Sequence, residues 1–207
     1  MKRGDEITVE ISSSAFEGKS VGRIDGYVIF VDGAVPGDVV TATVLKAKKN
    51  YAEARVLEIL TPSSLRSTPR CPSFGTCGGC KWQHVSYEAQ LRFKQQHVQE
   101  AFERIGGFEA LEVLPIIGAD EQYFYRNKME FSFSGQQWLP EAPQLTIHNS
   151  QFANRLFLGL HVPQRYDKVL DIGGCYLQSD ESTRILNFTR AFGRASGLSA
   201  YSGKSEE

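Results

Sequence analysis

The sequence lacks any hydrophobic run of the roughly 20 residues that a membrane-spanning helix needs. Its N-terminal segment, MKRGDEITVE, is charged and is not followed by the apolar stretch of a secretory signal peptide. Cysteine is scarce, with four in 207 residues, and outside a secretory context these thiols are not expected to form disulfides. These absences exclude a membrane protein and a disulfide-rich secreted domain, and they predict a cytoplasmic location without a membrane partner.

An excess of positive charge is also missing. The chain has 23 Lys and Arg against 24 Asp and Glu, a formal net charge of −1, so a basic surface extending over the whole protein is excluded. The charge is nevertheless uneven, because residues 63–104 carry a net charge of +3 while the rest of the chain carries −4. Any contact with nucleic acid is therefore expected to be local.

Three of the four cysteines are concentrated in the segment Cys71-Pro-Ser-Phe-Gly-Thr-Cys77-Gly-Gly-Cys80. The two glycines allow a tight turn that points Cys77 and Cys80 at one centre, and the amides of such a turn face the sulfur atoms. The spacing leaves three interpretations open: a cubane iron–sulfur cluster, a structural zinc held by four cysteines, and thiol chemistry through a redox dithiol or disulfides. Thiol chemistry is the weakest of these, because a redox C-x-x-C normally opens a helix after a strand.

Residues 7–60 predict a small β-barrel. Turn residues at Gly26, Asp32-Gly33 and Pro36-Gly37-Asp38 separate the runs ITVEI, SVGRID, YVIFV, VVTATV and YAEARVLEIL, which alternate as strands do. Pro62 cannot continue a strand ladder, so it marks a boundary between domains at 1–62 and 63–207. A five-stranded barrel of this kind is a common platform for oligonucleotides.

Two helices are predicted in the second domain. Helical spacing over 86–105 indicates a helix that Ser86 caps and Gly106-Gly107 ends, and its expected apolar face consists of Tyr87, Leu91, Val98, Phe102 and Ile105. The other helix covers 180–198, with Asp180 or Ser182 as its cap, and its apolar residues are Ile185, Leu186, Phe188, Phe192 and Leu198.

Strand-like runs fill the space between these helices, at 111–117, 128–135, 144–149, 155–162 and 168–174. They predict an antiparallel sheet with helices beside it. The expected fold class is therefore mostly β with α: an N-terminal five-stranded, OB-like barrel followed by an α+β domain whose antiparallel sheet carries the four-cysteine site.

The segment CPSFGTCGGCKWQHVSYEAQLRFKQQHVQEAFERIGG resembles the iron–sulfur signature of the RNA (uracil-5-)-methyltransferases, in particular the ribosomal-RNA RumA/RlmD group. YRNKMEFSF, at 125–133, is similar to a motif of that family's central domain, and residues 1–62 resemble its TRAM domain. In the family a distant fourth cysteine completes a [4Fe-4S] cluster, and Cys175 in VLDIGGCYLQ matches its position. The resemblance thus implies the metal ligands Cys71, Cys77, Cys80 and Cys175.

Cations and aromatic rings near these motifs are candidate RNA contacts, because cations attract phosphates and rings stack on bases. For the loop after VVTATV the alternative is a solvated hairpin tip, and for Tyr125-Arg126-Asn127-Lys128 it is a polar strand edge. The family context favours RNA contact for the loop, whereas residue chemistry alone leaves the two interpretations of Tyr125-Arg126-Asn127-Lys128 evenly balanced. The predicted contacts are Lys46, Lys48, Lys49, Tyr51, Arg55, Arg66, Arg70, Arg126 and Lys128.

Three further residues follow the cysteine segment in the sequence: Trp82, His84 and His97. His84 and His97 are predicted not to be metal ligands, because four cysteines already complete a site. Trp82 is predicted to shield the metal from water by packing rather than to stack on a base.

The resemblance implies a monomeric enzyme that forms 5-methyluridine in ribosomal RNA, 23S rRNA in particular. In that chemistry a cysteine thiolate adds to uracil C6, a general base removes the C5 proton, and a Rossmann-like domain binds S-adenosyl-L-methionine. The sequence shows no glycine-rich turn of that kind, and its four cysteines are assigned to the metal, so we expect an N-terminal part that is inactive alone. A stand-alone RNA-binding module with structural zinc and an iron–sulfur electron carrier are the alternatives.

Overall fold

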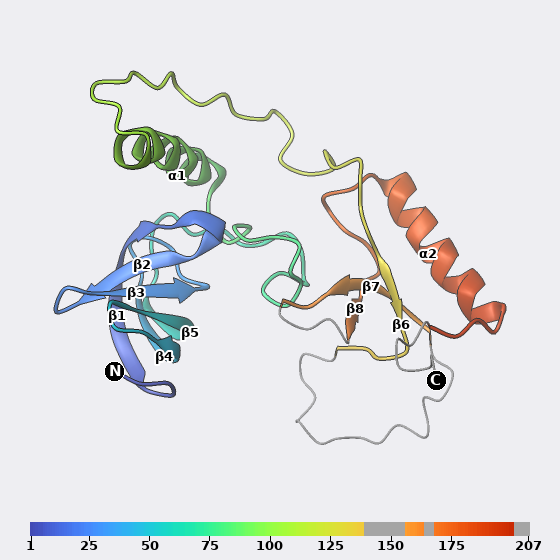
Figure 1. Cartoon of the computed structure of the whole chain (residues 1–207). Coiled ribbons are helices and arrows are strands. Elements are labelled where there is room, and N and C mark those ends of the chain that lie inside the picture. The colour runs from blue at the N-terminus through green and yellow to red at the C-terminus, as the bar shows by residue number, and fades with distance from the viewer. Residues whose placement is uncertain (139–155, 164–167, 201–207) are drawn as a thin grey trace. The chain divides into compact units, whose positions relative to one another are not determined.

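The structure is a computed structural model that describes residues 1–138, 156–163 and 168–200 (Figure 1). The chain forms two compact units, one made of Met1–Pro69 with Lys81–Ala119 and the other of Arg70–Cys80 with Asp120–Glu207. The cysteine loop therefore belongs to the second unit, although the chain enters it from the first unit and returns there. The functional division predicted at residues 62 and 63 stays a prediction.

The first unit contains a closed barrel of five strands (Figure 1). β1 (Glu6–Ser14) pairs antiparallel with both β2 (Ser20–Ile24) and β4 (Val39–Ala47), which closes the barrel. β3 (Tyr27–Asp32) pairs antiparallel with β2 and parallel with β5 (Tyr51–Thr61), and β5 in turn pairs antiparallel with β4. The predicted five-stranded barrel is confirmed.

Alternation along the strands builds the barrel core. On β4 the side chains of Val40, Ala42 and Val44 are buried, while the residues between them are only partly covered. They join Ile11 and Ile29 in one apolar cluster. Since apolar burial is the main favourable term in folding, this alternation explains why the barrel could be predicted from the sequence.

The first helix lies where it was expected but buries a different face. α1 (Tyr87–Glu100) continues as a π-helical turn, Ala101–Ile105, and ends at Gly106-Gly107 as predicted. Its buried residues are Ala89, Phe93 and His97, so the predicted face through Val98, Phe102 and Ile105 was wrong: those three side chains are exposed. The apolar surface available to the helix is a small cluster around Val35 and Val85. Residues 89, 93 and 97 are four apart, so they share the helix face that is turned toward this cluster. Ser86 precedes the helix, but its side chain makes no capping hydrogen bond.

Residues 111–117, all of them described, are not a strand, which corrects the prediction. Ile117 is 94% exposed, so the apolar run is not covered. Side chains of α1 satisfy the backbone instead: Gln95 Nε2 donates to the carbonyls of Val113 and Leu114 at 3.3 and 3.0 Å, and Gln99 Nε2 donates to that of Leu111 at 3.3 Å. Because amide side chains satisfy these carbonyls, the segment does not need a strand partner.

The second unit contains a three-stranded antiparallel sheet in the order β6, β7, β8. β6 (Ser132–Ser134), β7 (Phe157–His161) and β8 (Val169–Asp171) come from three of the predicted runs, and each strand is shorter than its run. The predicted strand at 144–149 lies outside the described residues. The expected antiparallel sheet is therefore present, with β7 at its centre.

α2 (Asp180–Ala195) begins one residue earlier than the predicted caps. Ser179 is the N-cap: its backbone is extended, and its Oγ accepts a hydrogen bond from the Ser182 amide at 3.2 Å, so the prediction of Asp180 or Ser182 was wrong. The helix buries Leu186, Arg190 and Gly193, whereas the other apolar residues predicted for it, Ile185, Phe188, Phe192 and Leu198, are exposed. None of the described helices combines the length and hydrophobicity needed to cross a membrane.

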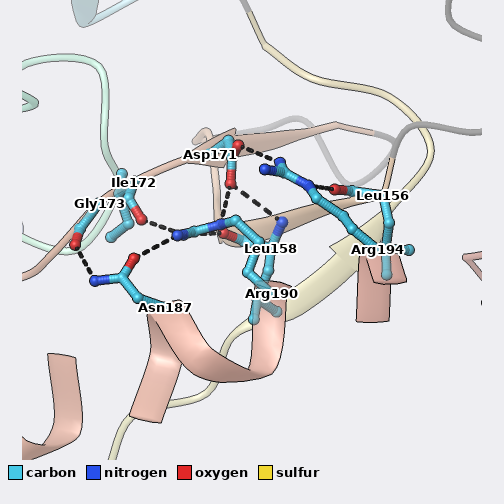
Figure 2. A network of polar contacts seen from close by, with 8 residues as sticks. All are labelled: Leu156, Leu158, Asp171, Ile172, Gly173, Asn187, Arg190 and Arg194. Carbon is cyan, nitrogen blue, oxygen red and sulfur yellow. Dashed lines mark hydrogen bonds and ion pairs between the residues drawn. The ribbon is translucent and has the colours of Figure 1, made fainter. Parts of the chain in front are cut away.

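Arg190 is buried in α2 because the sheet offers it a full set of acceptors (Figure 2). Its Nε donates to Asp171 Oδ1 at 2.8 Å, and its Nη2 donates to the carbonyls of Leu158 and Ile172. One turn further on, Arg194 Nη2 donates to Asp171 Oδ2 at 2.9 Å. A buried guanidinium is tolerated when it is paired and hydrogen-bonded in this way, so this network fastens α2 to β7 and β8.

Candidate metal centre and nucleic-acid contacts

The cysteine loop is a succession of tight turns closed by backbone hydrogen bonds. The amide of Phe74 donates to the Cys71 carbonyl at 3.1 Å, and the amide of Cys77 donates to the Ser73 carbonyl at 2.8 Å. The Gly79 amide donates to Cys77 Sγ at 3.4 Å, an amide facing a sulfur as the turn predicts. The loop therefore presents a hydrogen-bond donor where a thiolate would carry its charge.

Of the two glycines in the C-x-x-C segment, Gly78 is the more closely packed. A Cβ on Gly78 would lie 3.2 Å from the Pro163 ring and 3.3 Å from the His161 carbonyl, and one on Gly79 would lie 3.4 Å from Cys77 Sγ. The contacts at 161 and 163 place the turn beside the end of β7. Sheet and cysteine loop thus belong to one packed structure in the second unit.

The structure makes the four cysteines neighbours within the second unit. All four are half-buried thiols, and Cys77 and Cys175 pack against one apolar cluster formed by Leu158, Leu170, Ile172 and Leu186. Burial raises the pKa of the Cys77 thiol; the Gly79 amide opposes this, while Cys80, Cys71 and Cys175 each raise it further. Cys175 therefore lies close enough to the loop for its charge to act on Cys77.

Four thiols are a donor set that suits both a [4Fe-4S] cluster and tetrahedral zinc. A metal cation would offset the burial and the repulsion from neighbouring thiolates that raise the pKa of the Cys77 thiol. Among the residues that the structure describes, however, no three His, Cys, Asp or Glu side chains are arranged to hold a metal ion. The cysteines thus provide suitable donor atoms and lie near one another, but they are not arranged in a coordination geometry. Their role as ligands stays a prediction.

α2 positions the loop that carries Cys175 (Figure 2). Asn187 Nδ2 donates to the Gly173 carbonyl at 2.9 Å. Arg190 donates to the carbonyl of Ile172, which precedes Gly173. These anchors lie two and three residues before the cysteine. Sequence reasoning missed both residues, although an arginine that follows Leu186 by one helical turn was a signal of a buried charge.

The cations on the β4 and β5 hairpin are largely exposed. Lys46, Lys48 and Lys49 project into solvent, with Lys46 Nζ 3.7 Å from a carboxylate oxygen of Glu53. Tyr51 is half-buried and meets the Phe30 ring edge-on at 5.7 Å between centroids. Arg55 Nε lies 3.8 Å from Asp32, in an exposed pair. The hairpin therefore offers phosphates three exposed lysines, whereas the Tyr51 ring is already partly used in packing.

The remaining RNA candidates lie in both units. In the first unit Arg66 is bound to the buried Asp38. In the second, Lys128 Nζ pairs with Glu130 at 2.8 Å, and Arg126 Nε donates to the Lys128 carbonyl at 3.0 Å. Arg70, also in the second unit, has its guanidinium carbon about 5 Å from three aromatic rings. Their role in RNA binding, like that of the hairpin residues, stays a prediction.

His84, His97 and Trp82 all belong to the first unit, whereas the cysteines belong to the second. His84 is buried, and its burial together with the Arg66 charge lowers its pKa. His97 is hydrogen-bonded to Ser14 and stacks on Phe16 at 4.7 Å between ring centroids. Trp82 packs with the apolar cluster at α1. That the two histidines are not metal ligands and that Trp82 shields the metal both stay predictions.

Comparisons with known proteins agree with this arrangement. The family model of the TRAM domain matches residues 1–57. A protein of Chlorobaculum tepidum named an uncharacterized RNA methyltransferase is 42% identical over 210 residues, which cover 100% of this chain and 43% of that protein. A second protein of that name, from Porphyromonas gingivalis, is 44% identical over 185 residues, covering 89% of this chain and 40% of the relative. The chain thus spans about two fifths of the length of these relatives.

A solved structure resembles nearly the whole chain. The tRNA (uracil-54, C5)-methyltransferase of Pyrococcus abyssi, in complex with S-adenosyl-L-homocysteine, matches with a TM-score of 0.55 and 22% identity, covering 96% of this chain and 40% of that one. At this identity the likeness concerns the fold alone. The TRAM domain and the relatives, which cover 89% to 100% of this chain, confirm the expected kinship: this chain belongs to the family of TRAM-domain RNA methyltransferases.

Proposed function

We propose that this chain is the RNA-binding and metal-binding part of an enzyme that uses S-adenosyl-L-methionine to form 5-methyluridine in ribosomal RNA, with 23S rRNA as the substrate. The observation that carries the proposal is the gathering of Cys71, Cys77, Cys80 and Cys175 in one unit of a chain whose first 57 residues match a TRAM domain. The names of the relatives support RNA methylation, and that of the Pyrococcus abyssi protein supports uracil C5 as the position.

The residues of this chain have two roles in the proposal. The exposed lysines 46, 48 and 49 attract the phosphate backbone, which holds and orients the RNA without reading its sequence. The four thiolates hold the metal group, and a bound [4Fe-4S] cluster would join the cysteine loop to the loop of Cys175. The group therefore serves first to fix the second unit in one conformation.

We assign methyl transfer itself to the part of the enzyme that corresponds to the remaining three fifths or so of the relatives. When bound, S-adenosyl-L-methionine supplies the methyl group, and addition to uracil C6 needs a thiolate. The 207 residues contain four cysteines, and all four are committed to the metal in this proposal. Residues 1–207 are therefore expected to bind RNA as a monomer in the cytoplasm, where thiols stay reduced, and to transfer no methyl group alone.

Metal analysis tests the metal half of the proposal. Protein purified without oxygen should be brown and should contain iron and acid-labile sulfide. Replacing Cys175 with serine should lower the iron content and abolish the visible absorbance, whereas Ser73→Ala, a change inside the cysteine loop that removes no thiol, should leave both unchanged. Colourless wild-type protein with stoichiometric zinc would instead support the RNA-binding module with a structural zinc site.

RNA binding and methyl transfer are tested separately from metal content. Fluorescence anisotropy with labelled fragments of 23S rRNA should show an affinity that falls steeply with salt, and tRNA of equal length serves as the competitor. An equal preference for tRNA would contradict the proposed substrate. Residues 1–207 should transfer no label from S-adenosyl-L-methionine to these fragments, and measurable turnover would refute the division of labour.

A further inference from the structure

Arg70, which directly precedes the first cysteine, lies among three aromatic rings. Its guanidinium carbon is 5.1 Å from the ring centroid of Tyr123, 5.0 Å from that of Phe124 and 4.9 Å from that of Tyr176. A cation within about 6 Å of a ring centroid is attracted to the ring's electrons. Three rings thus surround one side chain, and we define Tyr123, Phe124 and Tyr176 as the aromatic cage.

The rings come from two segments that the backbone holds side by side. The amide of Phe124 donates to the Tyr176 carbonyl at 2.9 Å, and that of Arg126 donates to the Leu177 carbonyl at 2.8 Å. Phe124 has a φ of +58°, a left-handed conformation that a bulky residue rarely adopts, and its ring meets Tyr176 at 6.3 Å between centroids. The backbone pairing therefore fixes the rings without help from Arg70.

We propose that Arg70 is a positioning residue that joins the cysteine loop to the loop of Cys175 by inserting into this cage. Arg70 is adjacent to Cys71, and Tyr176 is adjacent to Cys175, so one contact brings two distant thiols together before any metal is bound. The inference rests on the metal-binding role proposed above. It also assigns Arg70 to the cysteine site rather than to the RNA contacts predicted from the sequence.

The chemistry of the cage favours arginine over lysine. A guanidinium is planar, stacks on rings and spreads its charge over three nitrogens, whereas an ammonium group is a compact charge that remains strongly hydrated. Arg70 is exposed, so a lysine at this position would keep its hydration and would contact the rings less well. Arg70→Lys should therefore behave between wild type and Arg70→Ala.

A metal-free experiment measures this positioning directly. In the full chain with Cys77 and Cys80 changed to serine, oxidised glutathione converts the Cys71 and Cys175 thiols into a disulfide and is itself reduced to two molecules of glutathione. Arg70→Ala should slow closure of this disulfide about tenfold, because it removes the attraction to three rings that raises the effective concentration of one thiol near the other. Arg70→Lys should show an intermediate rate.

Matched controls separate the cage from general damage. Tyr176→Phe keeps the ring and should close at the wild-type rate, whereas Tyr176→Ala should resemble Arg70→Ala. Arg184→Ala removes an exposed arginine of the second unit that pairs with Glu181 at 3.0 Å, and it should also close at the wild-type rate. Thermal unfolding followed by circular dichroism identifies any variant that fails to fold, and Arg70→Lys and Tyr176→Phe are the mildest changes.

Metal uptake provides the second measurement, in the chain with all four cysteines. Under limiting iron and sulfide, Arg70→Ala should acquire the visible absorbance several times more slowly than wild type. If wild-type protein takes up neither iron nor zinc, the proposed metal site fails, but the disulfide rates still test the role of Arg70. A wild-type rate of disulfide formation in Arg70→Ala would overturn the inference. If the salt slope of RNA binding also fell by about one unit in this variant, Arg70 would be assigned to a phosphate contact instead.

Discussion

Arg66 and Asp38 form a two-point ion pair inside the first unit. Arg66 Nε donates to Asp38 Oδ1 at 2.8 Å, and its Nη2 donates to Oδ2 at 2.6 Å. Asp38 is 0% exposed and also accepts the amides of Val35 and Ser63 at 2.6 and 2.8 Å. Burial alone would raise the pKa of Asp38, but the hydrogen bonds from Arg66 and the two amides outweigh it and lower that pKa. The pair fastens the segment after β5 to the turn before β4.

The first prediction is that Arg66→Ala strongly destabilises the first unit. The change leaves a buried carboxylate without its cation, and loss of one partner of a buried pair costs about 3–5 kcal/mol of unfolding free energy. Urea unfolding followed by Trp82 fluorescence, in a Trp138→Phe background, measures it. Arg55→Ala, which breaks the exposed pair with Asp32 in the same unit, should cost less than about 1 kcal/mol. Equal costs for the two variants would show that the buried pair contributes nothing special.

The second prediction concerns acid destabilisation through His84. Burial first, and then the charge of Arg66, lowers the pKa of His84 below its ordinary value of 6.5. Just below pH 6.5 the unfolded chain therefore binds a proton at His84 that the folded chain does not bind. The free energy of unfolding should fall as the pH drops from 6.5 towards the pKa of the folded state, by up to about 1.4 kcal/mol per unit of pH. Above the ordinary pKa this contribution should not change with pH.

Removing the imidazole tests that assignment. His84→Gln should flatten the dependence of the first unit's stability between about pH 7.5 and about pH 5.5, whatever its effect on stability at neutral pH. His161→Gln, a change at an exposed histidine of the second unit, is the matched control and should leave the profile as it is in the wild type. An unchanged slope in His84→Gln would assign the acid sensitivity to other groups.

The third prediction is that the hairpin lysines contribute to RNA affinity through phosphates. Changing Lys46, Lys48 and Lys49 together to alanine should weaken binding to all RNA sequences alike and reduce the slope of log K against log salt by about one unit for each phosphate that is no longer bound. A triple change of Arg92, Lys94 and Arg104 to alanine removes the same charge from α1 and the turn after it. If both triple variants show the same reduction in slope, the effect is one of net charge, and the hairpin does not bind RNA specifically.

The fourth prediction is that replacing Gly159 destabilises the sheet of the second unit. It lies in β7, the central strand, where an added Cβ would be 1.8 Å from the Leu170 carbonyl of β8, so one strand must move. Gly159→Ala should destabilise the second unit by about 1–3 kcal/mol, the usual cost of overpacking. Hydrogen exchange of the β7 and β8 amides measures this, with Gly135→Ala as the control because nothing lies within 4 Å of its added Cβ. Protection equal to that of the wild type would show that the sheet can adjust.

The barrel and the tight turn that carries Cys77 and Cys80 could be predicted from the sequence because each depends on local patterns. Alternation in VVTATV places Val40, Ala42 and Val44 on one side of β4 whatever lies beyond it. The helices were predicted as helices for the same reason. The faces that these helices bury were not predicted. α1 covers only the small cluster at Val35 and Val85, and α2 places Arg190 rather than Phe188 against the sheet.

The sequence by itself determined that the strands form a barrel and that three thiols lie within ten residues of one another. It could do so because periodicity and spacing act over a few residues. Only the tertiary structure decided that Cys175 lies near Cys77, that Arg66 is held by Asp38, and that Arg70 is surrounded by rings from two other segments. Such partners are far apart along the chain, and burial, which depends on every neighbouring segment at once, selects them.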